Sequence, residues 1–290
     1  MEEAVEKIEP GSSIAAGLAL EHAIPFGAGH EIIRQGIDGL TLIGPISDML
    51  FDQVIGADLV EGVRAAWVGN VSAGTGYNFR RAVENDEIDV EDHSNFSIAL
   101  ALKAGSMGVP YLPTRSLLGS DIHDRSDLFL EHEDPFSGGN IVLVPSINPD
   151  WAIVHVQRSD PLGNAHAWGN TGIAEPAIGA ADNVLVTAEE IVSTEVIKSD
   201  PNRTFVTKNE VTAVVECPYG AHPSPVSGYY NRDNEYFLDY HTQTKTPDDY
   251  EEWADEWVYG VESREEYMEL VDKKLDITEV TTAAEVKYGQ

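Results

Sequence analysis

Short apolar runs alternate with segments whose apolar residues recur at helical spacing, and glycine or proline separates many of them. The early runs predict strands at Ile14–Leu20, Leu40–Ile43 and Arg64–Val68. Later runs are near-continuous and rich in β-branched residues, as strands buried on both faces are: Ile141–Val144, Ala152–Val156, Val184–Val186 and Val211–Val215. Strands separated by helical stretches predict an α/β fold with an open, mostly parallel sheet covered by helices.

Start and stop signals mark the predicted helices. A turn at residues 25–29 leads into a helix that Gly36 ends, because glycine readily adopts the left-handed conformation that follows a helix. Ser47 and Ser94 are placed to cap the next two helices through their side-chain oxygens. The apolar positions of these helices are, in chain order, Ile32 and Ile33; Leu50, Phe51 and Val54; and Phe96, Leu100 and Ala104, with the last helix running through Lys103.

Two more helices are predicted near the C-terminus. Thr246-Pro247-Asp248-Asp249 combines a cap residue, a first-turn proline and first-turn acids, and Ser263-Arg264-Glu265-Glu266 is a capping box. The segment from Thr114 to Gly139 is rich in polar and turn residues, and we interpret it as a long functional loop rather than a domain boundary. We therefore predict one α/β domain over residues 1–245 and a C-terminal helical extension, residues 246–290, packed on the same domain.

The charge of the chain is strongly unbalanced. Its 50 Asp and Glu residues face 18 Lys and Arg residues, which gives a formal net charge of -32. At low salt such a surface repels itself, whereas at 1 M salt the Debye length falls to about 3 Å and the repulsion is screened. Since the acids are spread among regular apolar segments, we expect an acidic surface suited to molar salt; a merely acidic protein of a low-salt cell is the alternative. Without a basic stripe, nucleic acid is not expected as a partner.

Cysteine usage and hydropathy bear on the cellular compartment. Cys217 is the single cysteine, so no internal disulfide can form, and its place after an apolar run predicts a small buried side chain. The first six residues are acidic where a secretory signal would be basic, and no run of about 18 apolar residues occurs. We expect a cytoplasmic protein that has no membrane partner.

Two glycine-rich turns after strands are candidate anion sites. Unpaired N–H groups at a helix start favour negative charge, and donors preset in this way stabilise oxyanions. The first turn offers Phe26, Gly27 and Gly29, with a plain tight turn as the alternative. The second turn, Gly69–Gly76, lacks the Gly-x-Gly-x-x-Gly spacing of dinucleotide loops, so nicotinamide binding is not expected, and a solvated loop is the alternative.

Acidic, histidine and arginine side chains give further candidates. Glu91 and His93 lie just before a predicted helix, where a carboxylate beside an imidazole can transfer protons. On the long loop, Arg115 can pair with a substrate carboxylate, with Ser120 nearby; an ion pair with a surface acid is the alternative. No acid–histidine group has the strict spacing of a zinc site, so no metal is predicted. His155, inside an apolar strand, is interpreted as a core histidine.

Four stretches, taken in order, resemble the α subunit of the glutaconate-type class I coenzyme A transferases. Any one of them alone is a weak signal, but their order and spacing cover residues from about 11 to 240. The stretches are Ile24–Gly36; Glu91–Phe96 with Val109–Ser116 and Gly119–Asp121; Ala152–Asp160 with Gly163–Ala165; and Val186–Val192 with Pro218–Pro223 and Gly228–Tyr230.

The resemblance implies a CoA-transferase or ribose-phosphate-isomerase-like fold that pairs with a homologous β subunit, often as an α2β2 assembly. In such enzymes a glutamate of the partner attacks an acyl-CoA, giving a mixed anhydride and then a glutamyl-CoA thioester, and an acceptor carboxylate reverses the sequence. The CoA thioester is then a substrate, and no cofactor is bound permanently. The Glu-x-Gly-type motif of the family has no convincing copy here, because we expect Glu61-Gly62 between a helix and a strand. The nucleophile is therefore expected on the partner.

For this chain, the resemblance implies groups that bind the oxyanion and the acyl moiety. It places the second glycine-rich turn, with Asn70 and Ser72, at the active site, together with the segment of Glu91 and His93. Two alternatives stay open: a subunit of a related hydrolase that cleaves acyl-CoA esters or a CoA-linked ring fragment, and a non-catalytic binding subunit that only orders its partner. The acyl group is also open, since glutaconate, 3-oxoacids and short fatty acids all present a carboxylate.

Overall fold

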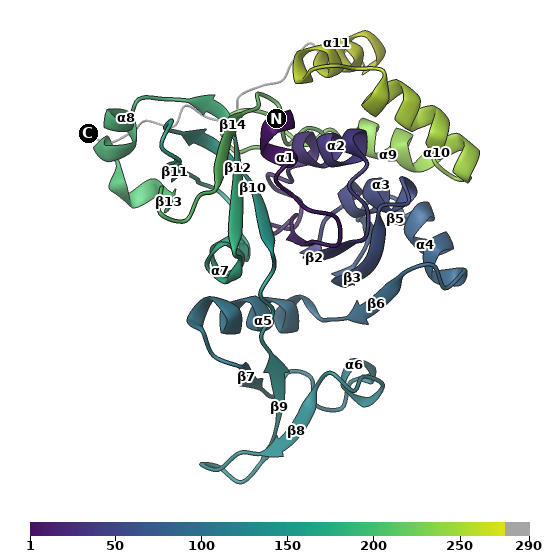
Figure 1. The fold of residues 1–290 in the computed structure, drawn as a ribbon. Coiled ribbons are helices and arrows are strands. Elements are labelled where there is room, and N and C mark those ends of the chain that lie inside the picture. Colours follow the sequence, from purple (N-terminus) through teal and green to yellow (C-terminus); the bar gives the residue numbers. More distant parts are fainter. Residues whose placement is uncertain (276–290) are drawn as a thin grey trace.

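The structure, a computed structural model, describes residues 1–275. Within these residues a nine-stranded sheet forms the centre, helices cover both of its faces, and a smaller sheet projects from one end (Figure 1). The central strands are β1 (Ser13–Ala15), β2 (Leu40–Ile46), β3 (Val60–Trp67), β6 (Asp89–Asp92), β10 (Trp151–Ser159), β11 (Ala165–His166), β12 (Asn183–Ile191), β13 (Thr204–Val206) and β14 (Ala213–Glu216).

The central sheet is mostly parallel, as predicted. Its parallel strands run in the order β14-β12-β10-β1-β2-β3-β6, and β11 and β13 continue antiparallel from the end of β10. Strands β10 and β12 pair in parallel from Trp151 opposite Asn183 to Ser159 opposite Ile191. All residues of β10 are buried, and its first part, Trp151–Val154, is a continuous apolar run, as in strands covered on both faces.

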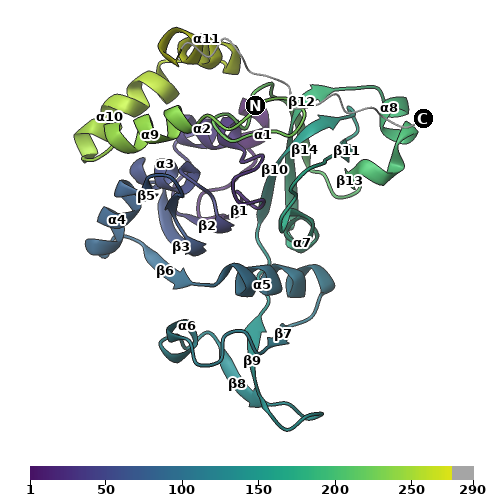
Figure 2. The ribbon, with the colours of Figure 1, turned by 180° about the vertical axis from the view of Figure 1, so that it is seen from behind.

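Helices form a layer on each face of the sheet (Figure 2). Leu42 of β2 points into one hydrophobic cluster and its neighbour Ile43 into the other, because successive side chains of a strand face opposite sides. The first cluster includes α1 (Glu2–Val5), α2 (Phe26–Gln35), α3 (Leu50–Gly56), α4 (Tyr77–Glu84), α9 (Asn234–Gln243), α10 (Pro247–Ala254), the π-helix η2 (Asp255–Tyr259) and α11 (Arg264–Leu275). The second includes α5 (Asn95–Met107) and α7 (Ala174–Ala180).

The projecting sheet corrects two predictions. It consists of β7 (Tyr111–Thr114), β8 (Leu130–Glu133) and β9 (Asn140–Pro145), paired antiparallel in the order β7-β9-β8. The run Ile141–Val144 therefore lies in this sheet and not in the parallel one, and its burial alternates, with Val142 and Val144 inward. The segment from Thr114 to Gly139 is not an irregular loop, because it contains β8 and the short helix α6 (Asp121–Asp124).

Several local boundaries also differ from the predictions. The first strand ends at Ala15 instead of Leu20, because Gly17 and Leu20 take positive φ angles and turn the chain away. Ser47 does not cap α3; its hydroxyl donates to the Ala16 carbonyl. Ser94 does cap α5 as predicted, in a capping box with Ser97. Along α5, Ala104 is buried as predicted, but Phe96 is half exposed, and Ile98, Ala101 and Leu102 are also buried.

The C-terminal helices pack on the face that carries α2 and α3 (Figure 1). Thr246 caps α10 as predicted, and it forms a capping box with Asp249. At the predicted capping box, the Ser263 hydroxyl accepts from the Glu266 amide. The aromatic side chains of Tyr250, Trp253, Trp257 and Tyr267 join the first hydrophobic cluster. The boundary between residues 245 and 246 stays a prediction, and residues 276–290 of the predicted extension lie outside the described residues.

The remaining elements are short connections. They are the hairpin strands β4 (Gly69–Asn70) and β5 (Gly74–Thr75), the helix α8 (Thr194–Ser199) and the 3-10 helix η1 (Pro201–Arg203). Among residues 1–275, no helix has both the length and the apolar composition needed to cross a membrane.

Candidate active site

Polar residues follow neighbouring strands at the carboxyl edge of the central sheet. Asp48 comes after β2, Asn70 after β3 and His93 after β6, and these strands are hydrogen-bonded neighbours. The His93 amide extends the ladder by donating to the Ala65 carbonyl at 3.0 Å. In open parallel sheets, ligands bind in the crevice outside the carboxyl ends of the strands. A ligand site is therefore expected at this edge.

Asp48 is the centre of a buried polar network at this edge. Its carboxylate accepts from the Asn70 side-chain amide and from Arg232 Nη1, each at 2.7 Å. The residue is only 1% exposed and has a φ of 49°, a left-handed conformation that costs energy outside glycine. Burial raises the pKa of Asp48 to about 6, and the charge and hydrogen bond of Arg232 offset only part of that rise.

The glycine-rich hairpin of β4 and β5 is tied to this network through Asn70. The Asn70 side-chain oxygen accepts from the amides of Ser72 at 2.8 Å and Ala73 at 3.1 Å. Asn70 itself is fully buried, whereas Val71 and Ser72 are exposed at the hairpin tip. As placed, Asn70 holds the hairpin and does not face a ligand, while Ser72 is open to one.

Glu91 and His93 form the acid–histidine pair expected from the sequence. His93 Nε2 lies 2.9 Å from Glu91 Oε1, and Nδ1 lies 3.2 Å from Ser97 Oγ. Arg64 Nε is 3.6 Å from the same Glu91 oxygen. Partial burial raises the pKa of Glu91, but the hydrogen bond of His93 and the charge of Arg64 outweigh burial and leave it below its usual value. Glu91 is thus an anion at neutral pH.

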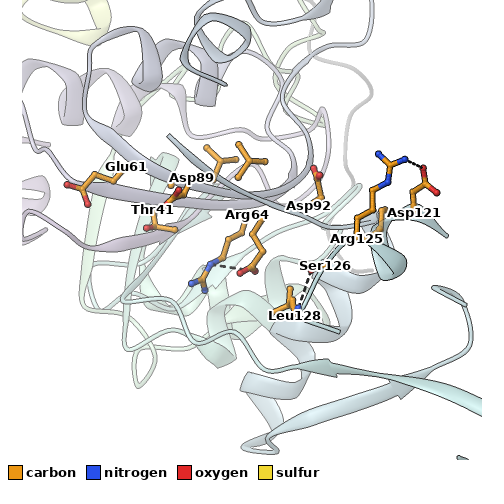
Figure 3. A pocket seen from close by; sticks show the side chains of 14 residues that line it. Thr41, Glu61, Arg64, Asp89, Asp92, Asp121, Arg125, Ser126 and Leu128 are labelled. Atoms are coloured by element: carbon orange, nitrogen blue, oxygen red, sulfur yellow. Dashed lines mark hydrogen bonds and ion pairs between the residues drawn. The ribbon is translucent and has the colours of Figure 1, made fainter. Parts of the chain in front are cut away.

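An open cavity of about 720 Å³ lies beside Glu91, between β3, β6 and the α6 segment (Figure 3). Figure 3 shows the Arg64 guanidinium on one side of it and the ion pair of Arg125 with Asp121 on the other. Its other acidic side chains are Glu61, Asp89, Glu91 and Asp92. An anionic ligand would meet a negative field here, so the cavity suits an anion poorly.

Comparison with known proteins gives the family. The sequence model of the coenzyme A transferase family matches residues 1–217 of this chain. The chain belongs to the coenzyme A transferase family. Over 92% of its length it is 32% identical to the A subunit of the 3-oxoadipate CoA-transferase of Pseudomonas knackmussii, and the match covers 95% of that protein.

Two further relatives of this CoA-transferase chain are informative. The crystal structure of glutaconate coenzyme A-transferase from Acidaminococcus fermentans matches it with a TM-score of 0.86 and 31% identity, over 93% of this chain and 91% of that chain. The cholesterol ring-cleaving hydrolase IpdA subunit of Rhodococcus jostii is 26% identical over 94% of this chain and 95% of that protein. The predicted resemblance to the α subunits of class I CoA transferases is confirmed.

The first glycine-rich turn of the CoA-transferase chain is not an open anion site. Phe26, Gly27 and Gly29 form the first turn of α2 and are buried. Their amides donate to the carbonyls of Ile24, Gly220 and Pro25, respectively. No donor of these three residues is left for a ligand, so the structure does not support the oxyanion role expected for them.

Arg115 and Ser120 lie in the projecting layer of the CoA-transferase chain. Arg115 Nη2 is 3.1 Å from Asp134 Oδ2 and 2.7 Å from Ser137 Oγ, and the side chain is well exposed. Ser120 caps α6 and donates to the Leu117 carbonyl. Arg115 therefore forms an ion pair with a surface acid, which was the alternative to substrate binding. Contact of Arg115 or Ser120 with a substrate stays a prediction.

Three further predictions for the CoA-transferase chain concern His155, Cys217 and the Glu61-Gly62 pair. His155 is a hydrogen-bonded core histidine, with Nδ1 2.8 Å from Thr187 Oγ1 and Nε2 2.6 Å from Glu189 Oε1. Cys217 is buried, and burial raises the pKa of its thiol. Glu61-Gly62 lies within β3, not between a helix and a strand.

Sequence reasoning missed Asp48 and Arg232. Asp48 directly follows the serine that was interpreted as a helix cap, and its position after a strand was the available signal. Arg232 is 184 residues away in the sequence, so no local pattern pairs the two. Arginines are scarce among the many acids of this chain, and this scarcity was the only hint that each arginine has a specific acidic partner.

Proposed function

We propose that this chain is the α subunit of an acyl-CoA:carboxylate CoA transferase and that a homologous β subunit carries the catalytic glutamate. The observation that carries the proposal is the likeness to glutaconate coenzyme A-transferase over nearly the whole of both chains. The related 3-oxoadipate enzyme supports it, because the matching chain is one of that enzyme's subunits and so implies a second one. An α2β2 assembly and a cytoplasmic location are parts of the same proposal.

The proposed reaction is an exchange of a thioester for a carboxylate. A carboxylate oxygen of the partner's glutamate bonds to the acyl carbonyl carbon, and the CoA thiolate leaves. The thiolate then bonds to the glutamyl carbonyl of the anhydride and releases the donor's carboxylate. An acceptor carboxylate runs the same two steps backwards, so no external oxidant or permanent cofactor is needed.

This chain contributes binding groups at the carboxyl edge in the proposed enzyme. The exposed tip of the 69–76 hairpin, with Ser72, faces the shared site, and the buried Asp48 network holds it there. Glu91 lies at the flank of the site, and the buried His93 holds its carboxylate from behind. Negative charge developing in each step is stabilised by such preset polar groups rather than by solvent.

The division of labour can be tested by expressing this chain alone and together with a β-type chain, both in molar KCl. Only the pair should transfer CoA from an acyl-CoA to glutaconate, 3-oxoadipate or acetate. Borohydride added with acyl-CoA should reduce a glutamyl-CoA thioester on the β-type chain. Transfer by the lone chain, or a reduced glutamate found in it, would refute the proposal.

A hydrolase is the second candidate, because the ring-cleaving IpdA subunit is a relative over almost the whole chain. A hydrolase uses water, either to release CoA from an acyl-CoA ester or to cleave a carbon–carbon bond of a CoA-linked ring, whereas a transferase needs an acceptor carboxylate. Release of CoA from acyl-CoA, or opening of a CoA-linked ring, in acceptor-free buffer would therefore favour the hydrolase. A purely binding subunit is recognised by Asn70 and Glu91 variants that still assemble and leave turnover intact.

A further inference from the structure

Arg232 joins segments that are far apart in the sequence. Its Nη1 donates to Asp48 Oδ2 at 2.7 Å and lies 3.6 Å from Glu21 Oε2, and its Nε donates to Asn234 Oδ1 at 2.9 Å. The guanidinium carbon is 4.0 Å from the ring centre of Phe237 in α9. The loop after β1, the loop after β2 and the start of α9 thus meet at one side chain, which is only 12% exposed.

The network continues from Asp48 to the hairpin. The second carboxylate oxygen accepts from Asn70, and the amide oxygen of Asn70 accepts from Ser72 and Ala73 at the tip. Because Asn70 and Asp48 are both buried, solvent does not readily replace either partner in these hydrogen bonds. A change at Arg232 therefore reaches the hairpin tip through two side chains.

We propose that Arg232 and Asp48 are positioning residues that fix the tip of the 69–76 hairpin for catalysis. That Arg232 and Asp48 hold the hairpin tip does not depend on the proposed function. That the held tip serves catalysis does rest on it. Arg232 lies beyond residue 217, where the match to the family model ends, so the C-terminal part of the chain contributes to the site as well as to the core.

A purely structural role explains this arrangement less well. Asp48 has a left-handed backbone and a buried charge, both of which cost stability, and its carboxyl group remains harder to ionise than in water despite Arg232. Strained and buried polar groups of this kind are typical of sites where geometry serves function. Among the described residues, the charged groups that face Asp48 are Arg232 and Glu21.

The first test measures hydrogen exchange at the hairpin and needs no substrate. In Asp48→Asn and Arg232→Met, the amides of Ser72 and Ala73 should exchange about tenfold faster than in the wild type, because a hydrogen bond to a charged group is lost from the network. Arg232→Lys keeps a charge near Asp48 and should restore part of the protection. Unchanged exchange in Asp48→Asn and Arg232→Met would overturn the inference.

The second test follows the pH dependence of that exchange. In the wild type, protection of Ser72 and Ala73 should fall as the pH drops below about 6, where Asp48 takes up a proton. Asp48→Asn should show no such step. Asp150→Asn is the matched control, since Asp150 accepts two hydrogen bonds from Ser13 at the opposite, amino edge of the sheet. A step that persists in Asp48→Asn would contradict the assignment.

Activity of the complex with the β-type chain then separates the two proposals. The Asp48 and Arg232 variants should lower kcat by about 10- to 100-fold with a smaller change in KM, because misplacing a catalytic loop costs rate more than binding. Arg232→Lys should recover part of kcat. Altered exchange in a complex that transfers no CoA even as wild type supports the positioning role and refutes the proposed function. Altered exchange with unchanged kcat refutes the role in catalysis.

Discussion

At the scale of single residues, Asp48 and Asp150 show how the same side chain acquires opposite behaviour. Asp48 is desolvated and its pKa rises to about 6, from an ordinary value near 3.8. The hydrogen bonds of the Ser13 hydroxyl and amide lower the pKa of Asp150, which stays near the surface. Burial without full compensation favours the neutral acid, whereas donors at the surface favour the anion.

We predict that Asp48 makes folding less favourable as the pH rises from about 4 to about 6. In that range the folded state holds a proton that the unfolded state has lost, so stability falls with pH. The shift of about two pKa units corresponds to about 3 kcal/mol. Urea unfolding at constant molar salt should show this component in the wild type and lack it in Asp48→Asn.

Asp150 should behave in the opposite way in the same experiment. Because its folded pKa is lowered, its stabilising contribution is present above the unfolded value near 4 and is lost as the pH falls further. Asp150→Asn should therefore flatten the acid side of the stability profile only. Equal profiles for wild type and Asp48→Asn between pH 4 and 6 would contradict the account of Asp48.

At the scale of elements, helices α5 and α7 pack closely because small residues face each other. A methyl group on Gly105 of α5 would collide with the Ile147 carbonyl and come within 3.0 Å of the Ala180 side chain in α7. Ala101 and Ala104 of α5 and Ala177 of α7 are fully buried. The Ile147 carbonyl and the neighbouring helix α7 therefore leave no room for a side chain at position 105.

We predict that Gly105→Ala destabilises the protein by about 1–3 kcal/mol, the usual cost of overpacking. The sign is informative, since alanine favours a helix by about 1 kcal/mol over glycine where space allows. Gly139→Ala is the control, because a methyl group there meets nothing within 4 Å. Thermal or urea unfolding that finds Gly105→Ala as stable as the wild type would show that the backbone at Ile147 can move away from α5 at little cost.

At the scale of the whole molecule, the net charge is the dominant electrostatic feature. A formal charge of -32 on one chain opposes the compact state unless ions screen it. The ion pairs of the described residues join only some of the acids to arginine, lysine or histidine, and several of these pairs are well exposed. Exposed pairs contribute about 0–1 kcal/mol each, so they do not compensate for the repulsion.

We predict that the chain loses structure when it is moved from molar KCl into dilute buffer and regains it when salt is restored. Far-ultraviolet circular dichroism during stepwise dialysis measures this directly. Sucrose at matching osmolality is the control, because it is excluded from the protein surface but does not screen charge. A spectrum that stays the same in dilute buffer would mean that the acidic surface is not an adaptation to salt.

The sequence by itself determined the features that depend on near neighbours. The apolar runs of β10 and β12 predict buried parallel strands, and the capping sequences at Ser94 and Thr246 predict helix starts, because side-chain periodicity and caps act within a few residues. The ordered motifs likewise predicted the family. Of the candidate site, the pair of Glu91 and His93 was predictable, since two residues of separation already bring them together.

Only the tertiary structure decided which groups are left free and which charges meet. The glycine turn at Phe26–Gly29 has the composition of an anion site, yet a carbonyl from Gly220, nearly two hundred residues away, takes the Gly27 amide. The run at Ile141–Val144 is apolar like a central strand, but its partners are β7 and β8. Asp48 and Arg232 meet for the same reason: hydrogen-bond partners and strand neighbours are set by contacts between distant segments, which no local pattern contains.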